Sequence, residues 1–184
     1  MAQNALFAAV LLLASVAFVS SNDLIKCAPV LCKKLDIRKF VGTKEPIWTS
    51  NTTTKEHISC EVDQMKSMTQ GSILFTRKFD TYRELPPITK NHEGIFPKEQ
   101  QDVMQLRKPG YHFVAKETLV YLSEKYRCAV IKVTPVLRGH LSYYDLRIWN
   151  SAVGKGPHEK CITRFVKLAR TGHIIYNSKC QGIL

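Results

Sequence analysis

The sequence contains 184 residues, which suits a single domain of ordinary size. Its 27 basic and 15 acidic side chains give a formal charge of +12, which excludes an acidic or intrinsically neutral surface. Such a surface attracts anions such as heparin-like sugars, nucleic acid, anionic lipids or an acidic ligand. The charges are interspersed along the chain, so a solvated basic surface without a dedicated partner explains them equally well.

The N-terminal segment has the composition of a secretory signal. The first 21 residues contain no Lys, Arg, Asp or Glu, and residues 5–19 are apolar except for Ser15. This run is shorter than the roughly 20 residues that span a bilayer. Val19 and Ser21 are small enough to precede a signal peptidase site. We predict a signal peptide over 1–21 and one secreted, extracellular domain over 22–184. An uncleaved membrane anchor stays open because the segment lacks a basic start.

All six cysteines follow the predicted cleavage site, and they are Cys27, Cys32, Cys60, Cys128, Cys161 and Cys180. An even number in a secreted chain indicates three disulfides, which allows 15 pairings. The spacings contain no CxxC and no helical HxxxH pair, so we expect neither a metal site nor a cofactor. Asn51-Thr52-Thr53 is the only glycosylation sequon and predicts a glycoprotein.

The chain then alternates between β-favouring stretches and turns. After a short helical turn at Leu35 to Val41, ended by Gly42, eight stretches are rich in branched and aromatic residues. Pro86-Pro87 and Pro97 interrupt the fourth and fifth, where a loop is the alternative. The eight are Pro46 to Thr53, His57 to Thr69, Ser72 to Tyr82, Ile88 to Phe96, Val103 to Arg107, Tyr111 to Leu122, Cys128 to Val136, and Leu141 to Trp149.

Turn residues such as Gln70-Gly71 and Arg138-Gly139 separate these stretches, which favours antiparallel pairing in a sandwich or an up-and-down barrel. One amphipathic helix follows, with Pro157 at its start and Gly172 as its C-cap. Its expected apolar side consists of Cys161, Ile162, Phe165, Leu168 and Ala169.

No catalytic motif is present. The sequence lacks GxSxG, a Gly-rich phosphate loop and HExxH, so we predict that the protein is not an enzyme. No basic helix face free of the core or aromatic stacking platform supports nucleic-acid binding. An eight-stranded barrel, by contrast, is wide enough to hold one small molecule.

Several short motifs follow each other along the chain: Pro46-Ile47-Trp48 with Asn51-Thr52-Thr53, Cys128-Ala129-Val130, Tyr144-Asp145-Leu146-Arg147, and Gly156-Pro157 before Cys161. In these motifs, and over nearly the whole mature chain, the sequence resembles the tick salivary lipocalins of the tick histamine-binding protein family. The resemblance implies an all-β, eight-stranded antiparallel barrel with a C-terminal helix packed outside. It also implies the disulfides Cys60–Cys180 and Cys128–Cys161, which leaves Cys27 and Cys32 for each other.

The same resemblance implies sequestration of a host inflammatory mediator at a feeding site. Amine binders in this family look like Cys-Asp-aliphatic followed by Glu-Leu-aromatic, and the acids receive the ligand's ammonium group. Here Ala129 stands in place of the first acid, and Asp145 and Arg147 stand at the second element. Histamine or another biogenic amine is therefore the family's ligand class. Arg147 and the missing acid instead favour an anionic lipid mediator such as a leukotriene, because a guanidinium can clamp a carboxylate.

Asp145 and Arg147 share one face of the strand Tyr143 to Trp149, because residues two apart in a strand point the same way. They can contact a ligand, form a buried pair, or face outward. The predicted ligand-binding residues are Trp48, Phe75, Tyr111, Phe113, Tyr121, Tyr143, Asp145 and Arg147, with ordinary core packing as the alternative for each aromatic. Two other functions stay open: a protein-binding inhibitor of complement or coagulation, and a lipocalin without a ligand.

Overall fold

The computed structural model describes residues 34–81, 84–137, 139 and 141–184, and describes residues 84 and 85 in their backbone alone. The predicted signal peptide over 1–21 and the predicted Cys27–Cys32 pair lie outside these residues. Within them, no helix combines the length and the apolar character needed to cross a membrane.

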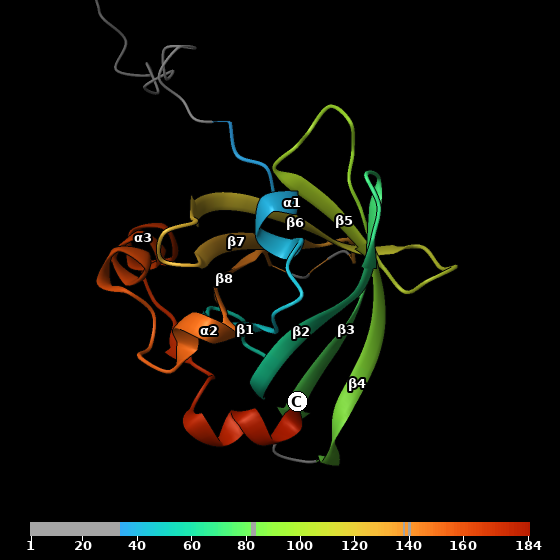
Figure 1. Ribbon diagram of the computed structural model, residues 1–184. Coiled ribbons are helices and arrows are strands. Elements are labelled where there is room, and N and C mark those ends of the chain that lie inside the picture. Colours follow the sequence, from blue (N-terminus) through green and yellow to red (C-terminus); the bar gives the residue numbers. More distant parts are fainter. Residues whose placement is uncertain (1–33, 82–83, 138, 140) are drawn as a thin grey trace, which may run out of the picture. The chain divides into compact units, whose positions relative to one another are not determined.

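Eight antiparallel strands form a closed barrel (Figure 1). Strand β1 closes it, since Ile47 and Trp48 pair with β2 while every residue of β1 except Ser50 pairs with β8. The fold predicted from the sequence is confirmed. The strands are β1 (Ile47–Thr52), β2 (Ile58–Met68), β3 (Ser72–Thr81), β4 (Glu84–Ile95), β5 (Val103–Arg107), β6 (Phe113–Ser123), β7 (Cys128–Pro135) and β8 (Tyr143–Trp149).

The Pro86-Pro87 region belongs to strand β4, so it is not the loop that the sequence left open as an alternative. A proline lacks a backbone N–H and is confined to positions where the ladder needs none. Strand β4 pairs with β5 only over residues 93–95, so its earlier part has a free edge on that side. The register with β3 also shifts between the pairs Phe79–Ile88 and Thr81–Glu84, and both prolines fall in that shift.

Helix α1 (Arg38–Val41) closes one end of the barrel. Ile37 and Phe40 are fully buried in the core, and Phe40 stacks on Trp149 with ring centroids 6.1 Å apart. The Trp149 Nε1–H also donates to the carbonyl oxygen of Phe40, at 3.1 Å. The turns after β1, β3, β5 and β7 lie at the opposite end, which we call the mouth of the barrel.

Helix α3 (Glu159–Ala169) packs on the outside of strands β7 and β8, as predicted (Figure 1). Cys161 and Phe165 are buried against the barrel, and the Cys128–Cys161 disulfide joins helix to strand. The predicted ends of the helix, Pro157 as its first residue and Gly172 as its C-cap, were each wrong by two residues. His158 is the N-cap, because its side chain accepts the Lys160 N–H, and Arg170, at φ 60°, ends the helix before Gly172. Ile162 and Leu168 are exposed.

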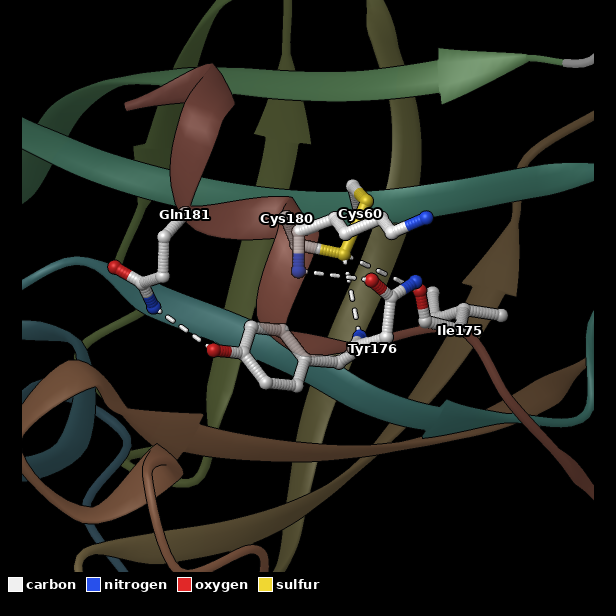
Figure 2. Close-up of a disulfide and its surroundings, with 7 residues drawn as sticks. Cys60, Ile175, Tyr176, Cys180 and Gln181 are labelled. Carbon is white, nitrogen blue, oxygen red and sulfur yellow. Dashed lines mark hydrogen bonds between the residues drawn. A yellow bond between two sulfur atoms is a disulfide. The ribbon is translucent and has the colours of Figure 1, made fainter.

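The C-terminal segment fills a gap between strands β1 and β2. After helix α2 (Asn150–Val153) and helix α3, the short strand β9 (His173–Ile174) pairs with β1, and a 3-10 helix, η1 (Ser178–Ile183), follows. Cys60 adopts φ 54° at a bulge in β2, and its N–H donates to the carbonyl oxygen of Ile175, at 2.9 Å. Figure 2 shows the Cys60–Cys180 disulfide that fixes this segment. Both implied disulfides within the described residues are present.

Candidate functional site: an ion network inside the barrel

The face of strand β8 that carries Tyr143, Asp145, Arg147 and Trp149 points into the barrel. Asp145 and Arg147 are each only 2% exposed. The opposite face contributes Leu146 and Ile148 to packing layers outside the barrel wall. The two charged residues are therefore interior groups, and the outward-facing alternative is wrong.

Arg147 is held by carboxylates from three strands. Its Nη1 donates to Glu117 Oε2 at 2.7 Å, and its Nη2 donates to Glu117 Oε1 and to Asp145 Oδ2, both at 2.9 Å. Asp63 Oδ2 lies 3.6 Å from Nη1. Arg147 Nε is buried without a partner among the described residues. Four of its five N–H groups thus face carboxylates, which leaves little donor capacity for a further anion.

A second guanidinium extends the network across the barrel. Arg77 on strand β3 donates from Nε and Nη2 to the two oxygens of Asp63, both at 2.7 Å, and from Nη2 to Glu117 Oε1 at 3.1 Å. Glu117, on strand β6, therefore binds both arginines and is fully buried. The network runs from strands β2 and β3 to strands β6 and β8 and fills the middle of the interior.

Two interior carboxylates have hydroxyl partners on strand β1. Thr52 Oγ1 donates to Asp145 Oδ1 and Thr49 Oγ1 donates to Glu61 Oε1, both at 2.7 Å. Glu61, on strand β2, makes no ion pair with either arginine among the described residues, although it is only 7% exposed. Among the described residues, this interior network thus contains four carboxylates and two guanidiniums.

These environments lower the pKa of Glu117 and raise the pKa values of Glu61 and Asp145. Burial acts to raise the pKa of Glu117, but Arg147 and Arg77 outweigh it and hold that pKa at about 2. Burial raises the pKa of Glu61, Asp145 adds to the increase, and Arg77 opposes it. Burial also raises the pKa of Asp145, against Arg147 and Thr52. Glu117 is therefore ionised at neutral pH. Ionising Glu61 and Asp145 costs free energy in the folded protein, and a cationic ligand beside them would lower that cost.

Two cavities lie near this network, one toward helix α1 and one toward the mouth of the barrel. On the side of α1, an apolar cavity of about 20 Å³ beside Asp63 has room for a single water molecule. At the mouth, a hollow of about 450 Å³ reaches Tyr143, which precedes Asp145 on the inward face of β8. Its lining comes from the β1–β2 and β7–β8 connections and includes Thr53, Thr54, Lys55, Glu56, Pro135, Gly139, Leu141, Ser142 and Tyr143.

The predicted aromatic wall residues do not gather in one place. Phe75 is inside, where it stacks on His92 with centroids 5.5 Å apart and lies 5.7 Å from the Arg77 guanidinium. Tyr143 is also inside, and burial raises the pKa of its phenol. Phe113 is 38% exposed at the start of β6, and Tyr111 is 61% exposed in the preceding turn.

Trp48 and Tyr121 lie outside the barrel wall. Trp48 packs edge-on against Tyr176, and its Nε1–H donates to Asn150 Oδ1 at 2.8 Å. Tyr121 packs in the layer beneath α3, because the register with β7 shifts between Leu119 and Tyr121. Phe113 and Tyr121 are an even number of residues apart, which in a regular strand would place them on the same face. The bulge breaks this alternation, so the two side chains need not share a face. Of these predicted aromatic residues, Phe75 and Tyr143 line the interior of the barrel, whereas Trp48 and Tyr121 do not.

Asp63, Arg77, Glu117 and Glu61 were missing from the predicted site. Arg77 and Glu117 each occupy an inward position between two apolar inward residues, whereas Glu61 and Asp63 are two residues apart on the inward face of β2. Arg77 lies between Phe75 and Phe79, and Glu117 lies between Ala115 and Leu119. A charged residue at such a position was the available signal. Ala129 pairs directly with Arg147, so the acid that meets this guanidinium comes from Glu117 instead of position 129.

Other expected features have simple outcomes. Asn51 lies in strand β1 between Leu146 and Ile174, and its Oδ1 accepts from Ser50 Oγ, so its glycosylation stays a prediction. No group of three or more His, Cys, Asp or Glu side chains in the described part of the chain is arranged to hold a metal ion.

Solved structures share this architecture at low sequence identity. AM182, in its serotonin complex, matches with a TM-score of 0.61 and 15% identity over 81% of this chain and 94% of that chain. The chain has the lipocalin fold. Japanin from Rhipicephalus appendiculatus, bound to cholesterol, matches this lipocalin barrel with a TM-score of 0.55, 9% identity and coverage of 75% and 96%. The siderocalin Ex-FABP matches with a TM-score of 0.55 and 11% identity over 69% of this chain and 84% of that chain. No protein-family model and no curated protein sequence matches the chain.

Proposed function

We propose that this chain is a secreted lipocalin that sequesters a small biogenic amine, with histamine and serotonin as the first candidates. The observation that carries the proposal is the interior charge: four carboxylates face two guanidiniums, and Glu61 has no guanidinium partner in the described residues. A buried acid without an ion-pair partner is costly to ionise, and a bound ammonium group would lower that cost.

We place the ligand on the mouth side of the network. Tyr143, Asp145 and Glu61 interact electrostatically there, and Tyr143 also lines the hollow of about 450 Å³. In the proposed complex the ammonium group lies between Glu61 and Asp145, and the aromatic part of the ligand extends past Tyr143 toward the mouth. Arg147 holds Asp145 in place through the 2.9 Å contact. The serotonin complex of AM182 supports the choice of ligand class for this fold.

The geometry gives an anionic lipid mediator less support than the sequence did. That hypothesis needed Arg147 to be free to clamp a carboxylate, and its two terminal nitrogens already donate to Glu117 and Asp145. A fatty-acid carboxylate would also enter an interior in which acids outnumber bases. Japanin, which shares this fold, is nevertheless bound to cholesterol in its structure, so a lipid belongs in the binding test.

Calorimetry on the mature protein with histamine, serotonin and leukotriene B4 tests the proposal. We expect amine binding and expect Glu61→Gln to weaken it by roughly tenfold or more, because the substitution removes one close charge from a buried site. Glu99→Gln, at an exposed position, is the matched control and should leave the affinity unchanged. Binding of the leukotriene but of neither amine would refute the proposal.

A second candidate function is inhibition of a plasma protein of complement or coagulation. The observation that favours it is the network itself, which fills the middle of the barrel and leaves an inner cavity of about 20 Å³. Small-ligand sites are usually several hundred Å³ in volume. Inhibition of clotting or complement lysis by the mature protein, together with no heat of binding for any small ligand, would select this alternative.

A further inference from the structure

One edge of helix α3 carries a row of cations. Lys160, Arg164 and Lys167 are all exposed and follow each other at i, i+4 and i+7. On an α-helix these positions form one stripe, with steps of roughly 6 Å and 5 Å along the axis. The stripe borders a surface hollow of about 570 Å³ between the helix and strand β6, lined by Tyr121, Glu159, Lys160, Thr163, Arg164 and Lys167.

Aromatic rings position several of these cations. The Arg164 guanidinium lies 5.5 Å from the Tyr121 ring centroid. Lys160 and Lys125 place their ammonium groups 5.9 Å and 5.5 Å from the ring centroid of Tyr126. Tyr126 is itself fixed by stacking on His158, the N-cap of the helix, with centroids 3.6 Å apart. Cations held over rings lose less freedom on binding than free side chains do.

These cations lack acidic ion-pair partners among the residues that the structure describes. In the ranges that the structure describes, Lys125, Lys160, Arg164 and Lys167 form no ion pair, whereas Arg38, Arg77, Arg107, Arg127 and Arg147 do. Among the described residues that line the hollow, Glu159 is the single acid, against three cations. The formal charge of the chain is +12, so the wider surface also favours an anion.

We propose that this stripe binds a linear sulfated polysaccharide of the glycosaminoglycan type. A row of preplaced cations along a shallow hollow suits a chain that carries regularly spaced anionic groups. A membrane fits less well, because Ile162 and Val166, two of the helix's exposed apolar residues, lie roughly 150° around the axis from the stripe, although Leu168, at roughly 70°, lies nearer to it. One flat surface cannot engage both sets of side chains.

The test measures affinity for a heparin oligosaccharide of defined length by calorimetry at physiological salt. The site variant combines Lys160→Gln, Arg164→Gln and Lys167→Gln. The control variant combines Lys39→Gln, Lys44→Gln and Lys98→Gln, three exposed lysines outside helix α3, and changes the net charge equally. We expect the site variant to bind on the order of tenfold more weakly, from three exposed charge contacts, and the control to stay within about twofold. The site variant should also show a shallower salt dependence, because it releases fewer counterions.

Three outcomes would overturn the proposal. Equal weakening of both variants would assign the binding to overall charge, and unchanged affinity for desulfated heparin would remove the sulfate groups from the interaction. Binding to phosphatidylserine vesicles without binding to the oligosaccharide would assign the stripe to a membrane surface. Amine binding should be the same in the site variant and in the unmodified protein, so failure of this proposal and of the amine proposal are separately visible.

Discussion

The substitution Glu117→Gln isolates the carboxylate that joins both interior arginines. Glutamine has nearly the same shape as a protonated glutamic acid, so the change removes the negative charge while keeping the volume. Asp63 still binds Arg77 through two 2.7 Å contacts, and Asp145 still binds Arg147. What is lost is the attraction between one buried charge and two guanidiniums at 2.7–3.1 Å.

The expected loss follows from the acid's pKa. The pKa of Glu117 falls from 4.5 to about 2, and at about 1.4 kcal/mol per unit this corresponds to about 3 kcal/mol of folding free energy. Breaking a buried ion pair by removing one partner typically costs about 3–5 kcal/mol, which agrees. Because the pKa is lowered on folding, the contribution is complete above pH 4.5 and disappears as the pH falls toward 2.

Urea unfolding under non-reducing conditions, followed by the fluorescence of Trp48 and Trp149, measures this difference. We expect Glu117→Gln to lower the unfolding free energy by about 3 kcal/mol at pH 7 and by much less near pH 2. Glu93→Gln breaks the more exposed 2.8 Å pair with Arg107 and should cost less than about 1 kcal/mol. A difference below about 1 kcal/mol at pH 7, or one that does not change with pH, would refute the reasoning.

Three further changes test separate parts of the fold. Glu61→Gln should raise the melting temperature at pH 7, since burial raises the Glu61 pKa and the ionised acid destabilises the folded state; a pH titration of melting should show the gain disappearing in acid. Replacing Cys60 and Cys180 by alanine opens a link across 120 residues and should lower the unfolding free energy by roughly 2–5 kcal/mol in urea. Gly94→Ala should cost about 1–3 kcal/mol in the same assay, because its Cβ would meet Met104.

The strand pattern was predictable because the local signals agree with the tertiary structure. Most strand boundaries lie within two residues of those expected from alternation and turn residues. The principal exception is β4, which begins at Glu84 instead of Ile88. That start depends on β4 having a free edge beside Pro86 and Pro87, which is a property of the assembled sheet.

The site was only half predictable, because register decides which residues meet. Parity placed Asp145 and Arg147 on one face, and that face is the interior. The bulge after Leu119, however, turned Tyr121 outward, and no local residue marks it. Arg147 also required partners, and its principal partner, Glu117, lies 30 residues away on a strand that is not its neighbour. Such a contact depends on how the barrel closes.

The proposed amine site is buried and acidic, whereas the proposed polyanion site is exposed and basic. The two binding activities should therefore respond differently to salt concentration. Exposed charges are screened beyond about 8 Å at physiological ionic strength, while buried charges are screened far less. Polyanion binding by Lys160, Arg164 and Lys167 should therefore weaken steeply as salt increases. Amine binding at Glu61 and Asp145, which are 7% and 2% exposed, should change little over the same range. Calorimetry of both ligands across a salt series measures the contrast, and parallel losses would place the amine on the surface instead of inside the barrel.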